Sequence, residues 1–147
     1  MENANSSMLT SSSGAFNSTG ILMTDSSTGS DGYWSDGSQE TAFDAVVTTT
    51  SIISIAVDFD NGGLWAAING TWVNSATLSE IVAGTTTNAA TVTSNENGWR
   101  FLVVPRNVSQ LIANFGQNAT FDDNTSAGGY SDENGYGNFK YAVPSGS

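Results

Sequence analysis

The side chains that could perform chemistry in this protein are carboxylates and aromatic rings. The chain contains neither histidine nor cysteine. The commonest general base and the commonest zinc ligand are therefore missing, and no thiolate site or disulfide can form. Serine–histidine and cysteine–histidine catalysis are excluded within the chain. The groups that remain for catalysis are the 14 Asp and Glu residues, the tyrosines and only three Lys or Arg residues.

One acidic motif, Asp58-x-Asp60-Asn61-Gly62, resembles the start of a calcium-binding loop. An EF-hand needs a bidentate acidic residue at its twelfth position, where this chain has Asn69. The spacing fits the end of a strand and a hairpin turn better. We therefore predict no metal site and no cofactor.

A second group of acids lies near the C-terminus, in segments rich in Gly and Asn. A pair of them could serve as acid and base in glycoside hydrolysis. No positioned partner or cleft motif accompanies them, so we interpret them as a solvated acidic loop and predict that the protein is not an enzyme. A carboxylate-dependent glycan hydrolase is kept as an alternative. The acids concerned are Asp122, Asp123, Asp132 and Glu133.

The aromatic residues divide into two groups by their surroundings. Trp65 and Trp99 lie in predicted strands and are predicted to be core residues, because aromatics dominate β cores; a binding role is their alternative. Tyr33, Trp34 and Trp72 lie beside turn residues, where an exposed ring would stack on a sugar or a protein. These three are the predicted ligand-binding residues, and a packing role is their alternative.

Residues 52 to 73 are the element around which the chain is organised. Ile53, Ile55, Val57 and Phe59 are apolar at alternate positions, which predicts a strand with that face buried. Asn61-Gly62 and Asn69-Gly70 are turn sequences. The apolar alternation continues between them, so we predict an antiparallel meander.

The rest of the chain is also typical of an all-β protein, since Ser, Thr, Asn and Gly are abundant and disfavour helices. One helical turn is expected at residues 76–82. Residues 1–14 are predicted to be a flexible segment and residues 15–147 a single domain. Seven to nine short strands joined by long Gly/Ser/Asn-rich loops favour an antiparallel β-sandwich, or a barrel. Further strands are expected at 15–23, around Tyr33-Trp34, at 85–87 paired with 90–93, at 98–104, at 110–115 and at 139–143.

The net charge of −11 disfavours several classes of partner. Binding along a nucleic-acid backbone needs a basic surface, and adhesion to anionic lipid needs clustered Lys or Arg. No apolar run approaches the length of a membrane span, and the N-terminus does not have the pattern of a secretory signal. We predict no nucleic-acid binding and no membrane insertion.

Three blocks in order resemble SPRY domains, in particular those of bacteriophage virion and tail-fibre proteins. The first is Asp58 to Trp65 with Asn69-Gly70 behind it, and the second is Trp99 to Val104. The third is Asn114-Phe115-Gly116-Gln117 with the tail from Gly135 to Gly146. Residues 33–146 match, whereas the strands that the family places before Tyr33 are not found. The chain is thus a shortened version or one whose missing strands come from a neighbour.

The resemblance implies a concanavalin-like bent sandwich of two antiparallel sheets that recognises proteins or ligands through its loops without catalysis. The expected function is that of a phage virion structural protein, a fibre, tail or head-decoration component on the exposed virion surface. Its expected partners are other virion proteins or copies of itself, with a host-surface glycan or protein as ligand. The alternative is a free-standing soluble module that binds a peptide or a carbohydrate.

Overall fold

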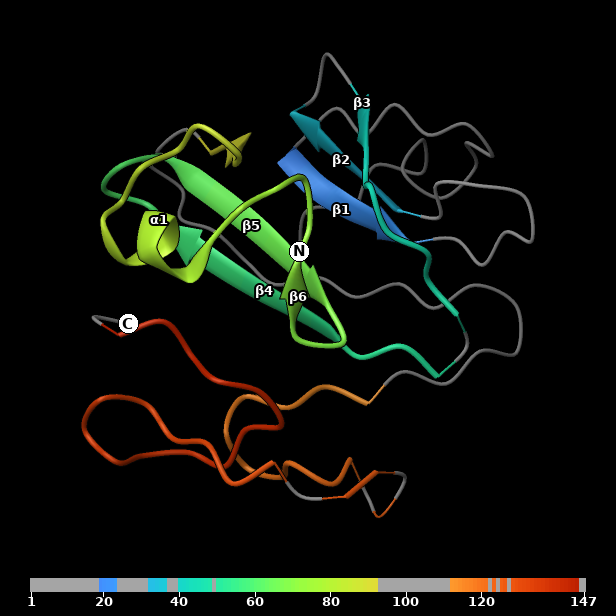
Figure 1. Cartoon of the computed structure of the whole chain (residues 1–147), viewed down its shortest axis with the longest axis vertical. Helices are drawn as coiled ribbons and strands as arrows, with labels where there is room; N and C mark the ends of the chain where they lie inside the picture. Colours follow the sequence, from blue (N-terminus) through green and yellow to red (C-terminus); the bar gives the residue numbers. More distant parts are fainter. Residues whose placement is uncertain are drawn as a thin grey trace, which may run out of the picture. The chain divides into compact units, whose positions relative to one another are not determined.

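The computed structural model describes residues 19–23, 32–36, 40–48, 50–92, 112–121, 123, 125–126 and 128–145. The chain divides into two compact units, residues 1–93 and 94–147, and each is described by itself. All strands and the single helix of the described residues belong to the first unit. Antiparallel strands dominate and the helix has only five residues, which confirms the predicted all-β class (Figure 1).

The first sheet of this unit has three antiparallel strands in the order β1-β2-β3. They are β1 (Thr19–Met23), β2 (Gly32–Asp36) and β3 (Glu40–Ala42). β2 is the central strand, with Tyr33 and Trp34 within it. The short strands expected from the apolar run before residue 24 and from the Tyr33-Trp34 pair are confirmed.

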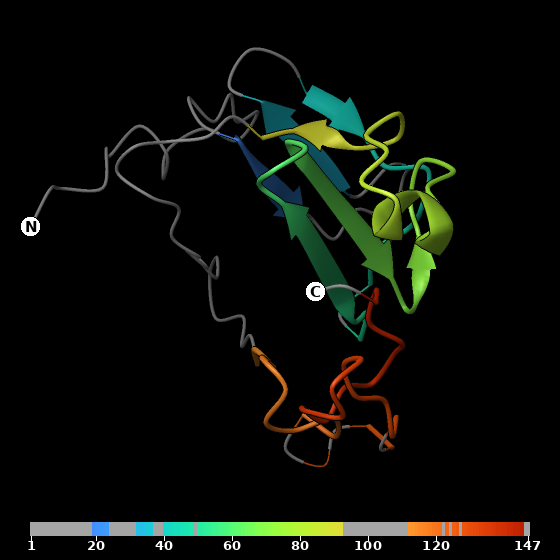
Figure 2. The same cartoon turned by 90° about the vertical axis from the view of Figure 1, so that its left-hand side faces the viewer.

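The second sheet contains the predicted meander. β4 (Ile53–Asp58), β5 (Gly63–Ile68) and β6 (Thr71–Trp72) follow each other in sequence and in space. β7 (Ala90–Thr91) pairs with the first two residues of β5, whereas β6 pairs with its last two. The expected pairing of residues 90–93 with residues 85–87 is therefore wrong. β5 therefore has β4 on one side and β6 and β7 on the other. Figure 2 shows β4 and β5 as the long antiparallel pair of this sheet.

Turn chemistry explains the chain reversals on either side of β5. Asn69 (φ 50°) and Gly70 (φ 83°) both adopt positive φ, as a two-residue hairpin turn requires. Gly62 (φ 75°) ends the preceding turn, and its neighbour Gly63 lies under the ring of Trp65. A Cβ at residue 63 would lie 2.2 Å from the indole, so only glycine fits beneath this ring. Both predicted turns are confirmed.

The helix α1 (Leu78–Val82) is the predicted helical turn, and its start is capped by side chains. Thr77 is the N-cap, and its hydroxyl accepts a hydrogen bond from the Glu80 N–H at 3.2 Å. The Thr77-x-x-Glu80 spacing is that of a capping box, in which the acidic side chain returns to the N-cap backbone. Ile81 is the buried residue of the helix. The short helix is thus stabilised at its N-terminus and by one core contact.

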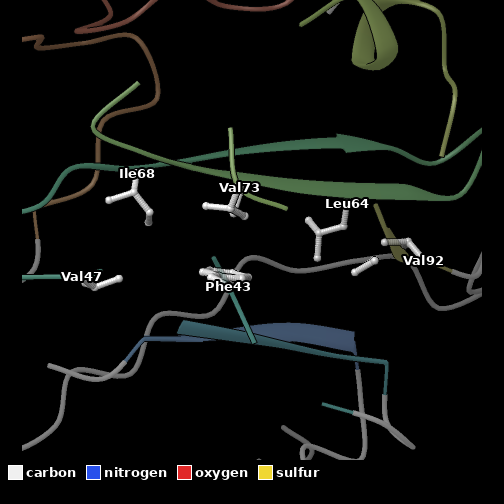
Figure 3. Packing of buried hydrophobic residues seen from close by; sticks show 8 residues of the cluster. Phe43, Val47, Leu64, Ile68, Val73 and Val92 are labelled. Atoms are coloured by element: carbon white, nitrogen blue, oxygen red, sulfur yellow. The ribbon is translucent and has the colours of Figure 1, made fainter. Parts of the chain in front are cut away.

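Two apolar clusters fill the first unit, and each uses one face of β5. The first cluster contains Leu64, Ala66 and Ile68 from β5 together with Phe43, Val47, Val73, Ala90 and Val92. Figure 3 shows Phe43 and Val47 facing Leu64, Ile68 and Val73 across this cluster. The second cluster contains Trp65, Ala76 and Ile81. All six residues of β5 are buried as a result, and the prediction that Trp65 is a core residue is confirmed.

The buried face predicted for β4 is wrong for most of its length. Ile55, Val57 and Phe59 are exposed by 42%, 43% and 49%, and only Ile53 packs against the first cluster. Ile55 lies opposite Ala66, and Val57 lies opposite Leu64. The alternating residues therefore do share the core face of the sheet, but the cluster is centred on β5. β4 is the outermost strand of the described sheet, so its side chains lie at the rim.

The second unit is described for most of residues 112–145. No strand is assigned to these described residues, in contrast to those of the first unit. Residues 112–115 and 139–143 do not form the predicted strands, since only an isolated bridge joins Tyr130 and Phe139. Phe115 and Ile112 are exposed by 71% and 41%, not buried on one strand face. Around residues 114–118, side-chain oxygens of Asn114 and Gln117 accept the backbone N–H bonds in place of a partner strand. The predicted strand 98–104 with Trp99, and residues 110–111, lie outside the described residues.

Candidate functional site

The candidate site is built on a loop of the second unit that begins at Tyr130 and returns at Phe139. The Tyr130 N–H donates to the Phe139 carbonyl at 3.2 Å, and the Phe139 N–H donates to the Tyr130 carbonyl at 2.8 Å. This reciprocal pair closes the loop as the first pair of a hairpin would. The ends of the ten-residue loop are therefore fixed by its own backbone.

The tip of this loop is held by one aspartate. Asp132 Oδ1 accepts hydrogen bonds from the Asn134 N–H at 2.9 Å and from the Tyr136 N–H at 2.7 Å. The Asp132 N–H in turn donates to the Tyr136 carbonyl at 2.8 Å. A side chain that bonds its own following backbone in this way replaces a regular turn. Asp132, one of the four acids considered for catalysis, thus has a structural partner for one of its oxygens.

Two tyrosines of this loop extend into solvent. Tyr136 is exposed by 74% and Tyr130 by 47%. Large rings on hydrogen-bonded backbone are suited to recognition, because they supply contact area with few rotatable bonds. Sequence reasoning missed both residues. The signal that could have found them is the glycine beside each ring, in Gly129-Tyr130 and Gly135-Tyr136-Gly137, since glycine next to an aromatic residue favours an exposed turn.

A cluster of amide side chains supports the base of the loop. Asn114 Oδ1 accepts from the N–H groups of Gly116 and Asn118, both at 2.9 Å, and Asn114 Nδ2 donates to the Asn138 carbonyl at 2.9 Å. The Asn138 N–H donates to the Gly116 carbonyl at 2.8 Å. The Asn-Phe-Gly-Gln motif therefore binds the returning end of the loop. Its role in this structure is to hold backbone.

Phe139 packs on glycine at the same place. A Cβ at Gly137 (φ 83°) would lie 2.3 Å from the Phe139 ring, and a Cβ at Gly116 (φ 98°) would lie 3.0 Å from it. The ring thus needs glycine on two sides. Lys140, next in the chain, donates to the carbonyl and the hydroxyl of Ser126. Together these contacts fix the segment that carries Tyr130 and Tyr136.

The structure places the three ring residues predicted from the sequence in the first unit. Tyr33 lies between Leu22 and Ala42, and Trp34 lies between Ile21 and Thr41, both within the central strand of the first sheet. Trp72 lies in β6 of the second sheet, where it is half-buried and packs against the cluster of Trp65. The three residues are therefore divided between two sheets. A binding role for them stays a prediction.

The acidic motif at the end of β4 serves the hairpin turn. Asp58 Oδ1 accepts from the N–H groups of Asp60 and Asn61, both at 2.9 Å, and Asp58 Oδ2 accepts from Asn61 Nδ2 at 2.8 Å. The bonds from Asn61 are the main reason that the pKa of Asp58 is lowered from 3.8. The backbone bond from Asp60 lowers the pKa further, and desolvation opposes it. These bonds already engage both carboxylate oxygens, as the hairpin interpretation expects.

Glu80 is a second carboxylate held by hydrogen bonds. Desolvation raises its pKa, but the hydrogen bonds that it accepts, chiefly those from Asn88, together outweigh this effect, so that the pKa is lowered from 4.5 overall. Asn88 donates its N–H to Oε1 at 2.8 Å and its side-chain amide to Oε2 at 3.0 Å. The backbone of Thr77 also lowers the pKa. The buried Trp65 N–H, which lacks a hydrogen bond of good geometry, lowers it least.

These carboxylates do not combine into a larger site. Among the described residues, no group of three or more acidic side chains is arranged to hold a metal ion. Asp122 lies outside the described residues, and Asp123 is exposed. In the same part of the chain, no helix has the length and apolarity to cross a membrane.

Comparisons with protein-family models, with curated proteins and with solved structures give no match.

Proposed function

We propose that this protein is a non-enzymatic structural component of a phage virion, a fibre, tail or head-decoration protein, whose exposed loops recognise a host-surface glycan or protein. The observation that carries the recognition part is the exposure of Tyr136 and Tyr130 on a hydrogen-bonded loop. The virion part rests on the sequence resemblance of residues 33–146 to SPRY domains of phage proteins. In this proposal the all-β fold is a SPRY-like antiparallel sandwich.

The chemistry of the loop supports stacking as the mode of recognition. A tyrosine ring offers an apolar face to the C–H groups of a sugar or to an apolar side chain, and its hydroxyl offers a hydrogen bond. Because Asp132 already fixes the backbone of Tyr136, little backbone entropy is lost when a ligand binds. A rigid exposed ring of this kind is typical of residues that dominate a binding interface.

Binding to host cells tests the recognition part. Cells of the bacterium on which the phage grows are incubated with labelled protein, and the bound fraction is measured. Tyr136→Ala should weaken binding about 30-fold, the loss expected for a residue that contributes about 2 kcal/mol. Tyr136→Phe should lose less, because the ring remains. Val82→Ala is the control, since Val82 is an exposed apolar residue (48%) of α1 in the other unit.

The position on the particle is tested separately. Antibodies raised against the protein should label purified phage particles at one structural element in electron microscopy. Particles without label would overturn the virion part and leave the alternative, a free-standing binding module, which the binding experiment then supports or excludes. If Tyr136→Ala binds as the unchanged protein does, the recognition role of this loop is wrong. Release of sugar from host polysaccharide would contradict the non-enzymatic assignment.

A further inference from the structure

The outer edge of β4 has the properties of a sheet edge to which another strand can be added. β4 is hydrogen-bonded to β5 on one side, and no other described strand pairs with it. Ile55 and Val57 are exposed by 42% and 43% on the face of the sheet that carries the core cluster. An edge strand with exposed apolar residues and free peptide groups favours the addition of another strand.

The hydrogen bonds of the sheet show which peptide groups of β4 face outward. The Asn69 N–H donates to the Ile52 carbonyl, so residues 52 and 69 form a hydrogen-bonded pair. Because such pairs alternate along an antiparallel ladder, Ser54 and Ala56 also bond to β5. The N–H and C=O groups of Ile53, Ile55 and Val57 therefore point away from β5. The three residues present both a backbone ladder and an apolar row.

Natural edge strands are usually protected by lysine, proline or a bulge. β4 has none of these, since its sequence is Ile-Ser-Ile-Ala-Val-Asp with a continuous register against β5. No charged residue occurs between Asp44 and Asp58, in a chain with a net charge of −11. The edge is thus an uncharged segment of an acidic protein, and its complement is another uncharged, extended, apolar strand.

We infer that this complement is β4 of a second copy of the chain, paired antiparallel about a two-fold axis through Ile55. In this register Ile55 lies opposite Ile55 of the second copy, and Ile53 lies opposite Val57. The exposed apolar residues of both copies then form one row, and the two four-stranded sheets become continuous. Two-fold pairing of identical edges is the simplest closed assembly, because it leaves neither β4 edge free.

Electrostatic repulsion between the carboxylates is small in this register. Asp58 of one copy lies opposite Ile52 of the other, so the two Asp58 carboxylates are separated by six residues, about 20 Å along the strands. This distance exceeds the Debye length of about 8 Å at physiological ionic strength. A parallel arrangement would instead place Asp58 beside Asp58 and Asp60 beside Asp60. Charge repulsion therefore favours this antiparallel pairing over the in-register parallel one.

Disulfide trapping tests the register, since the chain has no cysteine of its own. Cα atoms of a hydrogen-bonded antiparallel pair are about 5.5 Å apart, within the range that a disulfide bridges. Ile55→Cys should give a covalent dimer under mild oxidation. Val57→Cys is the matched control, because Val57 is exposed nearly as much as Ile55. It should not form a covalent dimer, because the two copies of residue 57 are about 14 Å apart along the strands. A mixture of Ile53→Cys and Val57→Cys should form a mixed dimer.

Sedimentation equilibrium of the full chain gives the second measurement. One added strand pair buries less area than a standard interface, so we expect weak association. The dimer should be present at about 1 mM and should dissociate on dilution to the micromolar range. Ile55→Lys should return the protein to monomer with an unchanged circular dichroism spectrum. Val46→Lys, at an exposed valine outside β4, should leave the dimer intact.

The inference is overturned if the unchanged protein stays monomeric over this range, or if Ile55→Cys and Val57→Cys crosslink equally. It does not depend on the ligand of the tyrosine loop, the loop from Tyr130 to Phe139 that carries Tyr130 and Tyr136. Loss of host binding in Tyr136→Ala with retained dimers, or the reverse, would separate the two proposals.

Discussion

Single side chains in this protein replace regular secondary structure as the means of holding the backbone. Asp58, Asn114 and Asp132 each accept two backbone N–H bonds from residues that follow them closely in sequence. Short polar side chains do this well because they reach their own backbone with few rotatable bonds. The richness in Asn and Asp is thus a structural property of the loops.

The Asp58 carboxylate makes a pH-dependent contribution to stability. Its folded-state pKa lies below 3.8, so it stabilises the folded state above pH 3.8, and this stabilisation is lost as the pH falls through the folded-state pKa. Asp58→Asn removes the charged acceptor and places two amides against each other at Asn61. We expect a lower melting temperature than in the unchanged protein near pH 6, with the difference shrinking below pH 3.8.

Asp60→Asn is the control for this measurement, because it makes the same change of charge two residues away. Differential scanning fluorimetry between pH 2.5 and 7 compares the two variants. Equal melting temperatures for Asp58→Asn and Asp60→Asn at pH 6 would show that the Asp58 bonds do not stabilise the hairpin.

Alanine substitutions at two glycines of the tyrosine loop distinguish the cost of a left-handed backbone from the cost of a steric overlap. Gly137 (φ 83°) and Gly135 (φ 81°) have the same left-handed backbone, but only a Cβ at residue 137 would meet the Phe139 ring. A left-handed alanine costs about 1–2 kcal/mol. Gly135→Ala should therefore speed hydrogen exchange of the Tyr130 and Phe139 amides about tenfold. Gly137→Ala should speed it more, and equal rates would contradict packing of the ring on Gly137.

At the scale of elements, the capping of α1 is the clearest local device. The Thr77 hydroxyl and the Glu80 side chain satisfy backbone groups at the start of a helix of only five residues. So short a helix is not stable by itself and depends on its cap and on the burial of Ile81. The α1 helix is thus stabilised both by its local cap and by the packing of Ile81 in the second apolar cluster.

Removal of the cap tests this dependence. Thr77→Ala should lower the free energy of unfolding by about 0.5–2 kcal/mol, because the Glu80 N–H loses its acceptor. Thr77→Ser keeps the hydroxyl and should stay close to the unchanged protein. Urea titration followed by tryptophan fluorescence gives the measurement, with Trp65 as the buried reporter in the cluster that α1 contacts. Equal losses in both variants would assign the effect to the Thr77 methyl group.

At the scale of the whole molecule, charge governs the response to ions. A net charge of −11 produces self-repulsion, which dissolved salt screens. The melting temperature should therefore rise as NaCl increases from about 10 to 150 mM, a range in which the Debye length falls from about 30 to 8 Å. A melting temperature that falls with salt would contradict net repulsion.

A comparison of CaCl2 with NaCl distinguishes screening of the net charge from calcium binding at a specific site. No acidic cluster suited to a metal is present among the described residues, and Asp58 is engaged in the hairpin turn. At equal ionic strength, CaCl2 and NaCl are expected to give the same melting temperature. A calcium-specific increase that saturates at micromolar concentration would contradict this and restore the calcium interpretation of the Asp58 motif.

Patterns of neighbouring residues are sufficient to predict much of the local structure of the first unit. The turns at residues 62 and 69–70, the strands β4 and β5 and the helical turn at Leu78–Val82 all follow from the identity of neighbouring residues. Glycine and asparagine permit positive φ, alternation identifies a strand, and a capping box starts a helix. The core role of Trp65 was also predictable, because apolar residues flank it on both sides.

The folded structure was needed to identify which apolar residues are buried and where the exposed rings lie. Alternation shows that Ile55 and Val57 share a face with Ile53, but burial depends on what covers that face, and the core cluster is centred on β5. In the second unit, side chains of Asn114 and Asp132 outcompete the expected strands. They thereby leave Tyr130 and Tyr136 exposed on the loop. Contacts between residues distant in sequence account for the first outcome. The second outcome comes from bonds between near neighbours in the sequence, which compete with the strand pattern.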